Sequence, residues 1–413
     1  MLRVDVAPDG PVTLPSGIGR RWEGALMAAT LLLLSLGLVT LYSASGFLAQ
    51  RQELPDWYYA LRQAEGAVIG LGILWVAARI PYRFWEAAAW PLLLGVTALL
   101  VLTVLPATET IAPEINGARR WLMLGGASVQ PSELAKIAVV VWTASAAVRR
   151  ADQLSSLSRG LLPFLLAWGV LVVPILLEPN LSTACLIALL GGLVVFAAGA
   201  RLAHFAFLGL LALPFLWAQL SVSFRAQRVM AFLDPAADPA GAGFQVRQSL
   251  VAIGSGGLTG LGFGEGRQKF GFLPEAHNDF IFAMVGEEWG LLGVSFLVAL
   301  YTTLVLVGMR IARWAPDEFG RLLAVGLTGI IGLQALVHMA VGLGLVPPTG
   351  LALPLISYGR SNQLVTLASL GMLIAVARAT DPYPVLPRAR APSEGAGSAA
   401  RRGRARRGGG TRA

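Results

Sequence analysis

The chain has 413 residues, of which 55% are hydrophobic and only 13% are charged, with a mean hydropathy of +0.67. An ordinary soluble domain is about 25% charged, so this composition excludes a soluble globular protein. The net charge of +9 comes almost wholly from arginine, much of it after Arg388, and the single cysteine, Cys185, excludes an internal disulfide.

The chain begins with a polar segment, residues 1–23, whose charges and prolines precede any apolar stretch. We therefore predict no cleavable signal peptide and a cytoplasmic N-terminal segment. Apolar stretches that can cross a bilayer as helices follow, at about 24–46, 63–80, 84–105, 133–148, 160–177, 181–199, 203–220, 280–309, 321–346 and 362–378. They predict an all-α polytopic membrane domain over residues 24–380.

Arginines cluster in alternate loops, and the positive-inside rule assigns those loops and both termini to the cytoplasm. The remaining loops then face outward, yet 106–132 carries Arg119 and Arg120, and 221–278 carries Arg225, Arg228, Arg247, Arg267 and Lys269. These cations break the rule, so either this topology is wrong or the outer loops carry positive charge because they bind an anion; we prefer the second interpretation.

The segment 221–278 is far longer than an ordinary connection, and such long loops are usually functional or disordered. Its phenylalanines and repeated glycines indicate a large ordered extracytoplasmic loop between helices 7 and 8. By contrast, the basic tail 381–413 is rich in Pro, Gly and Ala, which predicts disorder. We interpret the tail as a solvated topogenic segment rather than a nucleic-acid site; contact with anionic lipid headgroups is the alternative.

Asp279 stands where this loop becomes an apolar helix. Ionisable groups at the edge of the membrane are candidates for function, and partial desolvation raises the pKa of a carboxylate and suits it to act as a base. Glu275 and His277 are near enough in sequence to tune or position it. The alternative is that Asp279 only caps the helix N-terminus.

Further acids lie within apolar segments. Glu287 and Glu288 follow Asp279 on the same helix and are expected to pair with cations or polar groups of neighbouring helices, in a structural or tuning role. Glu133 and Lys136, at i and i+3, are expected to form an ion pair near the outer end of a span. That pair either stabilises the helix or, with Arg119 and Arg120, binds a pyrophosphate and a sugar hydroxyl.

The stretch 346–360, VPPTGLALPLISYGR, interrupts an apolar region with prolines and glycines. Broken backbone at membrane depth requires protein or a watery cavity to satisfy it, so we predict a re-entrant loop that lines a site and offers Ser357, Tyr358 and Arg360. A simple kinked loop is the alternative. No His, Cys or Asp cluster has zinc spacing, so we predict no protein metal site.

Several stretches in order, namely GARRWLMLGGASVQPSELAK, EPNLSTA, FLDP, LPEAHNDFIFAMVGEEWG and PPTGLALPLISYGRS, make the chain similar to the SEDS family of shape, elongation, division and sporulation proteins. The resemblance covers roughly residues 24–380, and it is greater to the division than to the elongation members. Asp279 matches the proposed catalytic acid of that family. Asn180 replaces the aspartate of a Glu-Pro-Asp motif, and Arg360 stands where glycine is common.

The resemblance implies a ten-helix peptidoglycan glycosyltransferase. It would polymerise lipid II on the outer face of the cytoplasmic membrane, with a class B penicillin-binding protein and other division proteins as partners. Asp279 would deprotonate the acceptor hydroxyl, and the remaining substrate-binding candidates are Arg119, Arg120, Glu133, Lys136, Arg228, Lys269, His277, Ser357 and Arg360. No cofactor is indicated; a divalent cation could share the stabilisation of the pyrophosphate, but no motif shows one. The alternatives are a lipid II flippase or transporter, an elongation polymerase, and a scaffold without catalysis.

Overall fold

The computed structural model describes residues 17–115, 117–125, 127–220, 222–234 and 241–380. The predictions for residues 1–16 and for the tail 381–413 lie outside the described residues. The described elements are the helices α1 (Ile18–Arg51), α2 (Tyr58–Ala77), α3 (Tyr82–Ala87), α4 (Ala89–Val104), α5 (Pro131–Arg149), α6 (Leu162–Leu177), α7 (Leu181–Ala197), α8 (Leu202–Leu220), α9 (Ser223–Leu233), α10 (Ala242–Ser255), α11 (Ile281–Arg313), α12 (Glu318–Gly342) and α13 (Arg360–Ala379), the short helical turns η1 (Pro106–Thr108), η2 (Ala151–Gln153), η3 (Leu157–Leu161) and η4 (Gln268–Phe270), and the strands β1 (Leu122–Leu124) and β2 (Ala127–Val129).

Every predicted span corresponds to a helix. Within the described ranges, eight helical segments are long and apolar enough to cross a membrane, and the shorter apolar helices α4 and α7 match the other two predicted spans. The all-α polytopic prediction is therefore confirmed. Several boundaries differ: α1 already begins at Ile18, α2 begins at Tyr58, and the third span is divided at Ala88 into α3 and α4. Helices α9 and α10 lie in the long loop, which is largely structured.

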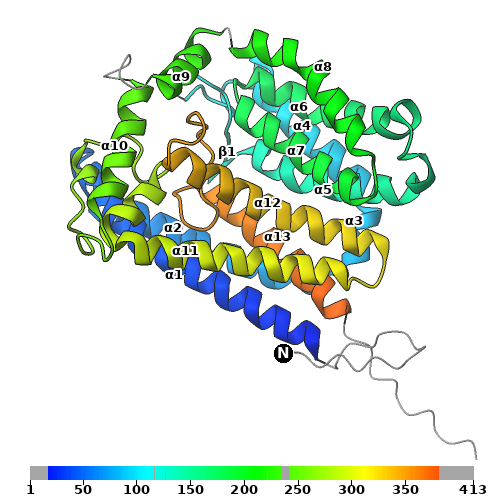
Figure 1. Cartoon of the computed structure of the whole chain (residues 1–413), viewed down its shortest axis with the longest axis horizontal. Helices are drawn as coiled ribbons and strands as arrows, with labels where there is room; N and C mark the ends of the chain where they lie inside the picture. Colours follow the sequence, from blue (N-terminus) through cyan, green and yellow to red (C-terminus); the bar gives the residue numbers. More distant parts are fainter. Residues whose placement is uncertain (1–16, 116, 126, 221, 235–240, 381–413) are drawn as a thin grey trace, which may run out of the picture. The chain divides into compact units, whose positions relative to one another are not determined.

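The most deeply buried helices are α5, α12 and α13. Figure 1 shows α12 and α13 between a group formed by α4 to α8 and a group formed by α1, α2 and α11. Helix α13 packs mainly on α2, with further contacts to α1 and α12. The centre of the membrane domain is thus formed by three helices that carry polar residues near one end, which we call the Asp279 end.

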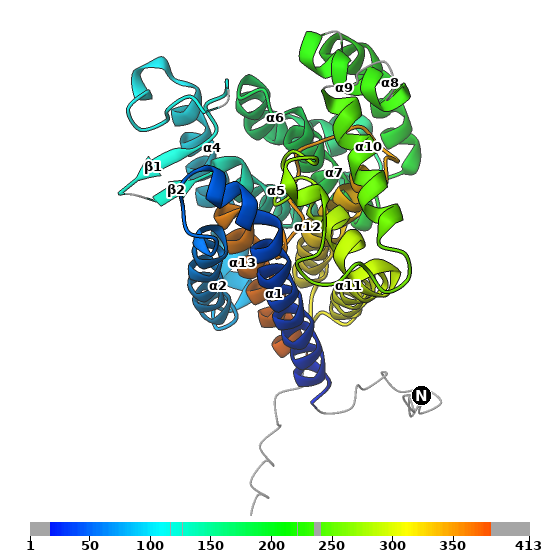
Figure 2. The ribbon, with the colours of Figure 1, turned by 90° about the vertical axis from the view of Figure 1, so that its left-hand side faces the viewer.

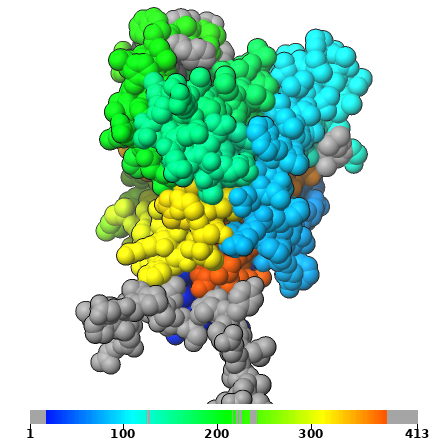
Figure 3. Space-filling model, turned by 90° about the vertical axis from the view of Figure 1, so that its right-hand side faces the viewer, coloured from blue at the N-terminus to red at the C-terminus, as the bar shows by residue number. Residues whose placement is uncertain are grey.

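Ion pairs and a carbonyl contact fasten the opposite end. Arg83 pairs with Asp317 at 3.0 Å, Arg378 Nε donates to Glu23 Oε2 at 2.9 Å, and Arg321 Nη2 donates to the Ala197 carbonyl at 2.9 Å. Figure 3 shows this end, where the turn between α11 and α12 (yellow) approaches the last part of α13 (orange). The first and last described helices therefore meet at the end opposite Asp279.

The segment between α12 and α13, residues 343–359, is non-helical, and its part from Leu351 to Ser357 is almost wholly buried, as expected for a re-entrant loop. Its carbonyl groups accept hydrogen bonds from side chains of surrounding helices, as a backbone at membrane depth requires. The donors are Gln334 to Ala352 O (2.7 Å), Gln63 to Ser357 O (3.0 Å) and Tyr301 to Pro354 O, and His338 Nδ1 lies 2.7 Å from Leu351 O.

Helix α11 is broken at Gly290, whose φ of 64° and ψ of −163° are outside the helical region. The loop after α10 supplies the missing backbone partners, because Leu261 N donates to Glu287 O at 3.0 Å and Leu291 N donates to the Gly257 carbonyl at 3.0 Å. A Cβ on Gly290 would lie 2.3 Å from Gly260 N, so only glycine allows this approach. The first two turns of α11 are thereby fastened to the long loop.

Candidate active site

Asp279 lies in the turn that leads into α11, and the next residue, Phe280, is buried in a cluster of apolar side chains. The N-cap position of α11 belongs to Phe280, and no side chain caps this helix by a hydrogen bond. Asp279 is therefore not the helix cap that the sequence offered as the alternative. Its carboxylate is therefore available to act as a base.

Burial, followed by the negative charge of Glu275, raises the pKa of Asp279 to about 6, against the opposing effect of Arg228 and Arg120. The carboxyl group stays ionised at neutral pH but is more basic than an ordinary aspartate. Gly350 of the re-entrant loop approaches it closely, since a Cβ at that glycine would lie 3.6 Å from Asp279 Oδ2. The carboxylate of Asp279 thus lies close to the backbone of a glycine, where no side chain covers it.

Arg120 and Arg228 lie on separate elements, and their charges act on this carboxylate. Arg228 of α9 donates to the Pro348 carbonyl of the re-entrant loop at 3.4 Å. Arg120, which precedes the β1–β2 hairpin, donates to the carbonyls of Glu178 (3.0 Å) and Pro179 (2.9 Å) at the end of α6. In Figure 2 the hairpin and the pair α9 and α10 stand on different sides of this face. The cations of the loops predicted to face outward therefore include two whose charges act on Asp279.

The other cation of that loop, Arg119, lies at the rim and pairs with the exposed Glu109 at 2.7 Å. Asn180, which replaces an acidic residue of the family motif, caps α7 by accepting from Thr183 N at 3.3 Å. Glu178 beside it is buried, and burial raises its pKa to about 7 despite the hydrogen bond from Thr103 and the charge of Arg120, which both lower it. Sequence analysis assigned no role to Glu178, although an acid next to an apolar span is a signal that could have drawn attention to it.

Ser357 and His277 join the re-entrant loop to the residues just before Asp279. Ser357 Oγ donates to the Asn278 carbonyl at 2.7 Å, and Tyr358 N donates to the His277 carbonyl at 3.1 Å. Burial lowers the pKa of His277, which favours the neutral imidazole. Ser357 is itself buried, so its geometry indicates that it positions the Asp279 turn.

Glu133 and Lys136 form the predicted ion pair, with 2.6 Å between Oε2 and Nζ, so that prediction is confirmed. Both side chains are almost wholly buried, and they bond to Asn362 of α13 (2.8 Å) and Gln334 of α12 (2.6 Å). The prediction that Lys136 offers a cation to a ligand requires a correction. Its ammonium group is enclosed by protein partners, so its position supports a role in joining α5, α12 and α13.

Lys269, Glu287 and Glu288 form a second enclosed group. Lys269 Nζ lies 3.2 Å from Glu288 Oε1 and donates to Ser43 Oγ of α1 at 2.9 Å. Glu287 accepts from the backbone N–H of Arg267 at 2.8 Å. The prediction that Glu287 and Glu288 pair with cations or polar groups is confirmed. Most of these partners come from the long loop and not from neighbouring helices. Lys269, only 8% exposed, thus fastens that loop to α11 and does not present its charge to a ligand.

Arg360 is the first residue of α13 and is half-buried. Its side chain packs on α2, where a Cβ on Gly66 would lie 3.3 Å from Arg360 Cγ. Helix α2 also contributes Gln63, which accepts from Gly359 N at 3.2 Å. Sequence analysis missed Gln63 and Gln334, although a glutamine within an apolar span is a detectable signal. Within the described ranges no group of three or more His, Cys, Asp or Glu residues could hold a metal ion.

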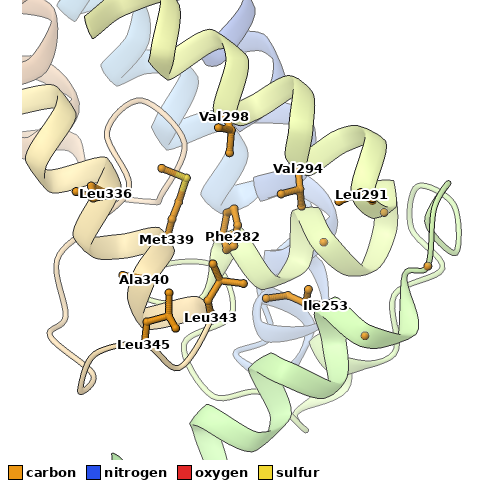
Figure 4. A pocket seen from close by; sticks show the side chains of 14 residues that line it. Ile253, Phe282, Leu291, Val294, Val298, Leu336, Met339, Ala340, Leu343 and Leu345 are labelled. Carbon is orange, nitrogen blue, oxygen red and sulfur yellow. The ribbon is translucent and has the colours of Figure 1, made fainter.

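An apolar groove lies beside this site, between α10, α11 and α12 (Figure 4). It measures about 570 Å³, and all its lining residues are apolar or glycine. Phe282, three residues after Asp279, lies at its inner side, and Leu336 and Met339 line the α12 side. The groove has no group that could act on a sugar, so we place the chemistry at Asp279 instead.

Comparisons with known proteins agree on one family. The family of cell cycle proteins that includes FtsW, RodA and SpoVE matches residues 24–381. The probable peptidoglycan glycosyltransferase FtsW of Geobacter sulfurreducens (strain DL-1 / KN400) is 41% identical over 86% of this chain and 95% of that protein. Stage V sporulation protein E of Bacillus subtilis (strain 168) is 38% identical over 86% of this chain and 96% of its own length.

Solved structures give the same result. A chain of a peptidoglycan synthase complex that coordinates polymerization and crosslinking is similar with a TM-score of 0.71 and 34% identity, covering 86% of this chain and 97% of that one. The rod shape determining protein RodA of Thermus thermophilus is similar with a TM-score of 0.62 and 29% identity, covering 87% and 97% of the two chains.

Proposed function

The chain belongs to the family of cell cycle proteins that includes FtsW, RodA and SpoVE, and from this membership we propose that Asp279 is the general base of its reaction. The enzyme is a peptidoglycan glycosyltransferase, in keeping with its FtsW relatives, and acts in cell division. The observation that carries the assignment is the Asp279 carboxylate, which does not cap α11 and whose pKa burial raises to about 6 against the charges of two arginines.

The proposed reaction joins two lipid-linked saccharides of lipid II. Asp279 removes the proton from the acceptor GlcNAc 4-hydroxyl as that oxygen attacks the anomeric carbon of the donor MurNAc. The bond from this carbon to the undecaprenyl pyrophosphate breaks, and the leaving group departs with the electron pair. Arg120 and Arg228 stabilise the negative charge that the pyrophosphate gains, while Ser357 and His277 position the turn that carries the base.

The orientation in the membrane follows from the charges at the two ends. The arginine-rich loops lie at the end where α1 begins and α13 finishes, which the positive-inside rule places in the cytoplasm. Asp279 and the convergent arginines lie at the other end. We therefore propose that both termini are cytoplasmic and that the active site faces the outside of the inner membrane, where lipid II is polymerised.

The function is tested by giving the purified full chain lipid II in detergent, with its partner present, and separating the glycan products by length. Glycan strands are expected, because the proposed reaction needs both substrates and the site but no sealed bilayer. A flippase or transporter would form no strands under these conditions. The absence of polymer from a folded, partner-bound enzyme would contradict the assignment.

We propose that the partner is a class B penicillin-binding protein, a transpeptidase, and that one of its membrane helices lies in the apolar groove. The groove lies between α10, α11 and α12. Its lining includes Gly254, Gly257, Gly286 and Gly290, whose small size allows a helix to approach closely. Charged substrate groups have no partner there. The surface therefore suits an apolar helix rather than a saccharide.

Filling the groove is expected to weaken this complex. Leu336 is 61% exposed, so Leu336→Trp adds bulk inside the groove without disturbing the core. We expect recovery of the co-expressed transpeptidase in a pull-down to fall by about tenfold, a loss of about 1.4 kcal/mol. Leu166→Trp, on a 65% exposed apolar position of α6, is the matched control and should leave recovery unchanged. Equal recovery with both variants would place the partner elsewhere.

A further inference from the structure

A second pair of arginines lies near the site, apart from Arg120 and Arg228. The guanidinium group of Arg62 on α2 lies over the ring of Tyr58 at 4.9 Å, and Arg360 packs on α2 from the start of α13. Both guanidinium groups act electrostatically on the Tyr358 hydroxyl, lowering a pKa that burial raises. In the part of the chain that the structure describes, the side chain of neither arginine forms a hydrogen bond or an ion pair.

Aromatic rings connect this pair to the turn of the proposed base. The rings of Tyr59, Tyr358 and His277 form a triangle with centroid distances of 5.2, 5.6 and 6.0 Å. Tyr358 N donates to the His277 carbonyl, two residues before Asp279. The Arg62 and Arg360 surface is thus structurally continuous with the active site, and its aromatic side chains are half-buried and not fully covered.

The two arginine pairs differ in their relation to Asp279. Arg120 and Arg228 are the cations that lower its pKa, whereas Arg62 and Arg360 act on Tyr358 instead. In the proposed reaction both saccharides carry a diphosphate. The donor diphosphate is attached to the carbon under attack, so it must lie beside the base. The acceptor diphosphate is separated from the reacting hydroxyl by the disaccharide, so it must bind further away.

We propose that Arg62 and Arg360, together with the ring faces of Tyr58 and Tyr358, form the subsite that holds the diphosphate of the acceptor. Arg120 and Arg228 then hold the donor diphosphate beside Asp279. Guanidinium groups suit this task because they can bind phosphate oxygens in a bidentate manner. The inference rests on the proposed function, since it requires two lipid-linked diphosphates to be bound at once.

The test measures binding of undecaprenyl diphosphate, which has no sugar or peptide, to the purified full chain in detergent micelles. The wild type is expected to bind two molecules per chain, and the double variant Arg62→Gln/Arg360→Gln only one. In the polymerisation assay that variant should raise the KM for lipid II by about tenfold, with kcat nearly unchanged at saturation. Arg51→Gln removes an exposed charge from the same end and is the matched control, with two molecules bound.

The variant Arg62→Lys/Arg360→Lys keeps both charges and should retain two bound molecules, which separates a loss of charge from a loss of folding. Unchanged binding of two molecules by the glutamine variant would overturn the inference. The inference would also be overturned if the glutamine variant bound lipid II more weakly but undecaprenyl diphosphate normally. The arginines would then recognise the peptide carboxylates of lipid II. Because binding is measured without turnover, these outcomes do not depend on whether Asp279 is the base.

Discussion

Asp279→Asn is expected to lower the rate of glycan polymerisation by about 10²–10⁴-fold, the usual contribution of a general base. The amide keeps the size of the carboxyl group but cannot accept the proton of the acceptor hydroxyl. The measurement is the rate of strand formation from lipid II by the purified complex. Folding and binding to the transpeptidase should be preserved, because no described hydrogen bond depends on this carboxylate.

Two controls distinguish the loss of a base from the loss of a negative charge. Asp56→Asn makes the same chemical change at an exposed position of the same end and should leave the rate unchanged. The wild-type rate should rise with pH through about 6, since the pKa of Asp279 is raised to about 6 and only the ionised carboxylate is active. Glu275→Gln removes the negative charge that raises this pKa, so the profile should move to lower pH. An Asp279→Asn enzyme with the wild-type rate would exclude this residue as the base.

Lys136→Met is expected to destabilise the protein by about 3–5 kcal/mol, because it leaves Glu133 as an uncompensated buried charge. The ammonium group lies 2.6 Å from that carboxylate and has almost no exposed surface. The measurement is the thermal unfolding transition of the purified chain in detergent, which should move well below that of the wild type.

The double variant Glu133→Gln/Lys136→Met removes both charges and should recover most of the lost stability. It also separates the two interpretations of this pair. If the pair only joins α5, α12 and α13, the double variant should polymerise lipid II with a near-normal KM. A stable double variant that binds lipid II poorly would instead mean that Lys136 contacts the substrate.

The spans and the position of the candidate base could be predicted because each depends on local pattern. Long apolar stretches fix the helices, and an acid at the edge of such a stretch identifies Asp279. The Glu133–Lys136 pair was predictable for the same reason, since i and i+3 residues share a helix face. A polar residue within an apolar span is a local signal, but the pattern does not show which residue of a distant helix will be its partner. For this reason Lys136 was expected to face a ligand, although Glu133 and Gln334 enclose its ammonium group.

The long loop illustrates a second limit. Its composition indicated order but not which residues would fasten it. The break at Gly290 and the backbone pairing with residues 257–262 depend on a close approach between two segments that each look ordinary in sequence. Lys269 was accordingly predicted to bind substrate, whereas Glu288 and Ser43 hold it in the interior.

The anchoring of the re-entrant loop has a consequence for biosynthesis. Its carbonyls depend on side chains from positions 63, 301, 334 and 338, and Ser357 in turn holds the turn at 278. A nascent chain has already inserted most of its helices before residues 343–359 leave the ribosome. The enzyme therefore gains its catalytic geometry only when translation is nearly complete. A truncated chain that lacks α13 would insert into the bilayer without a complete active site.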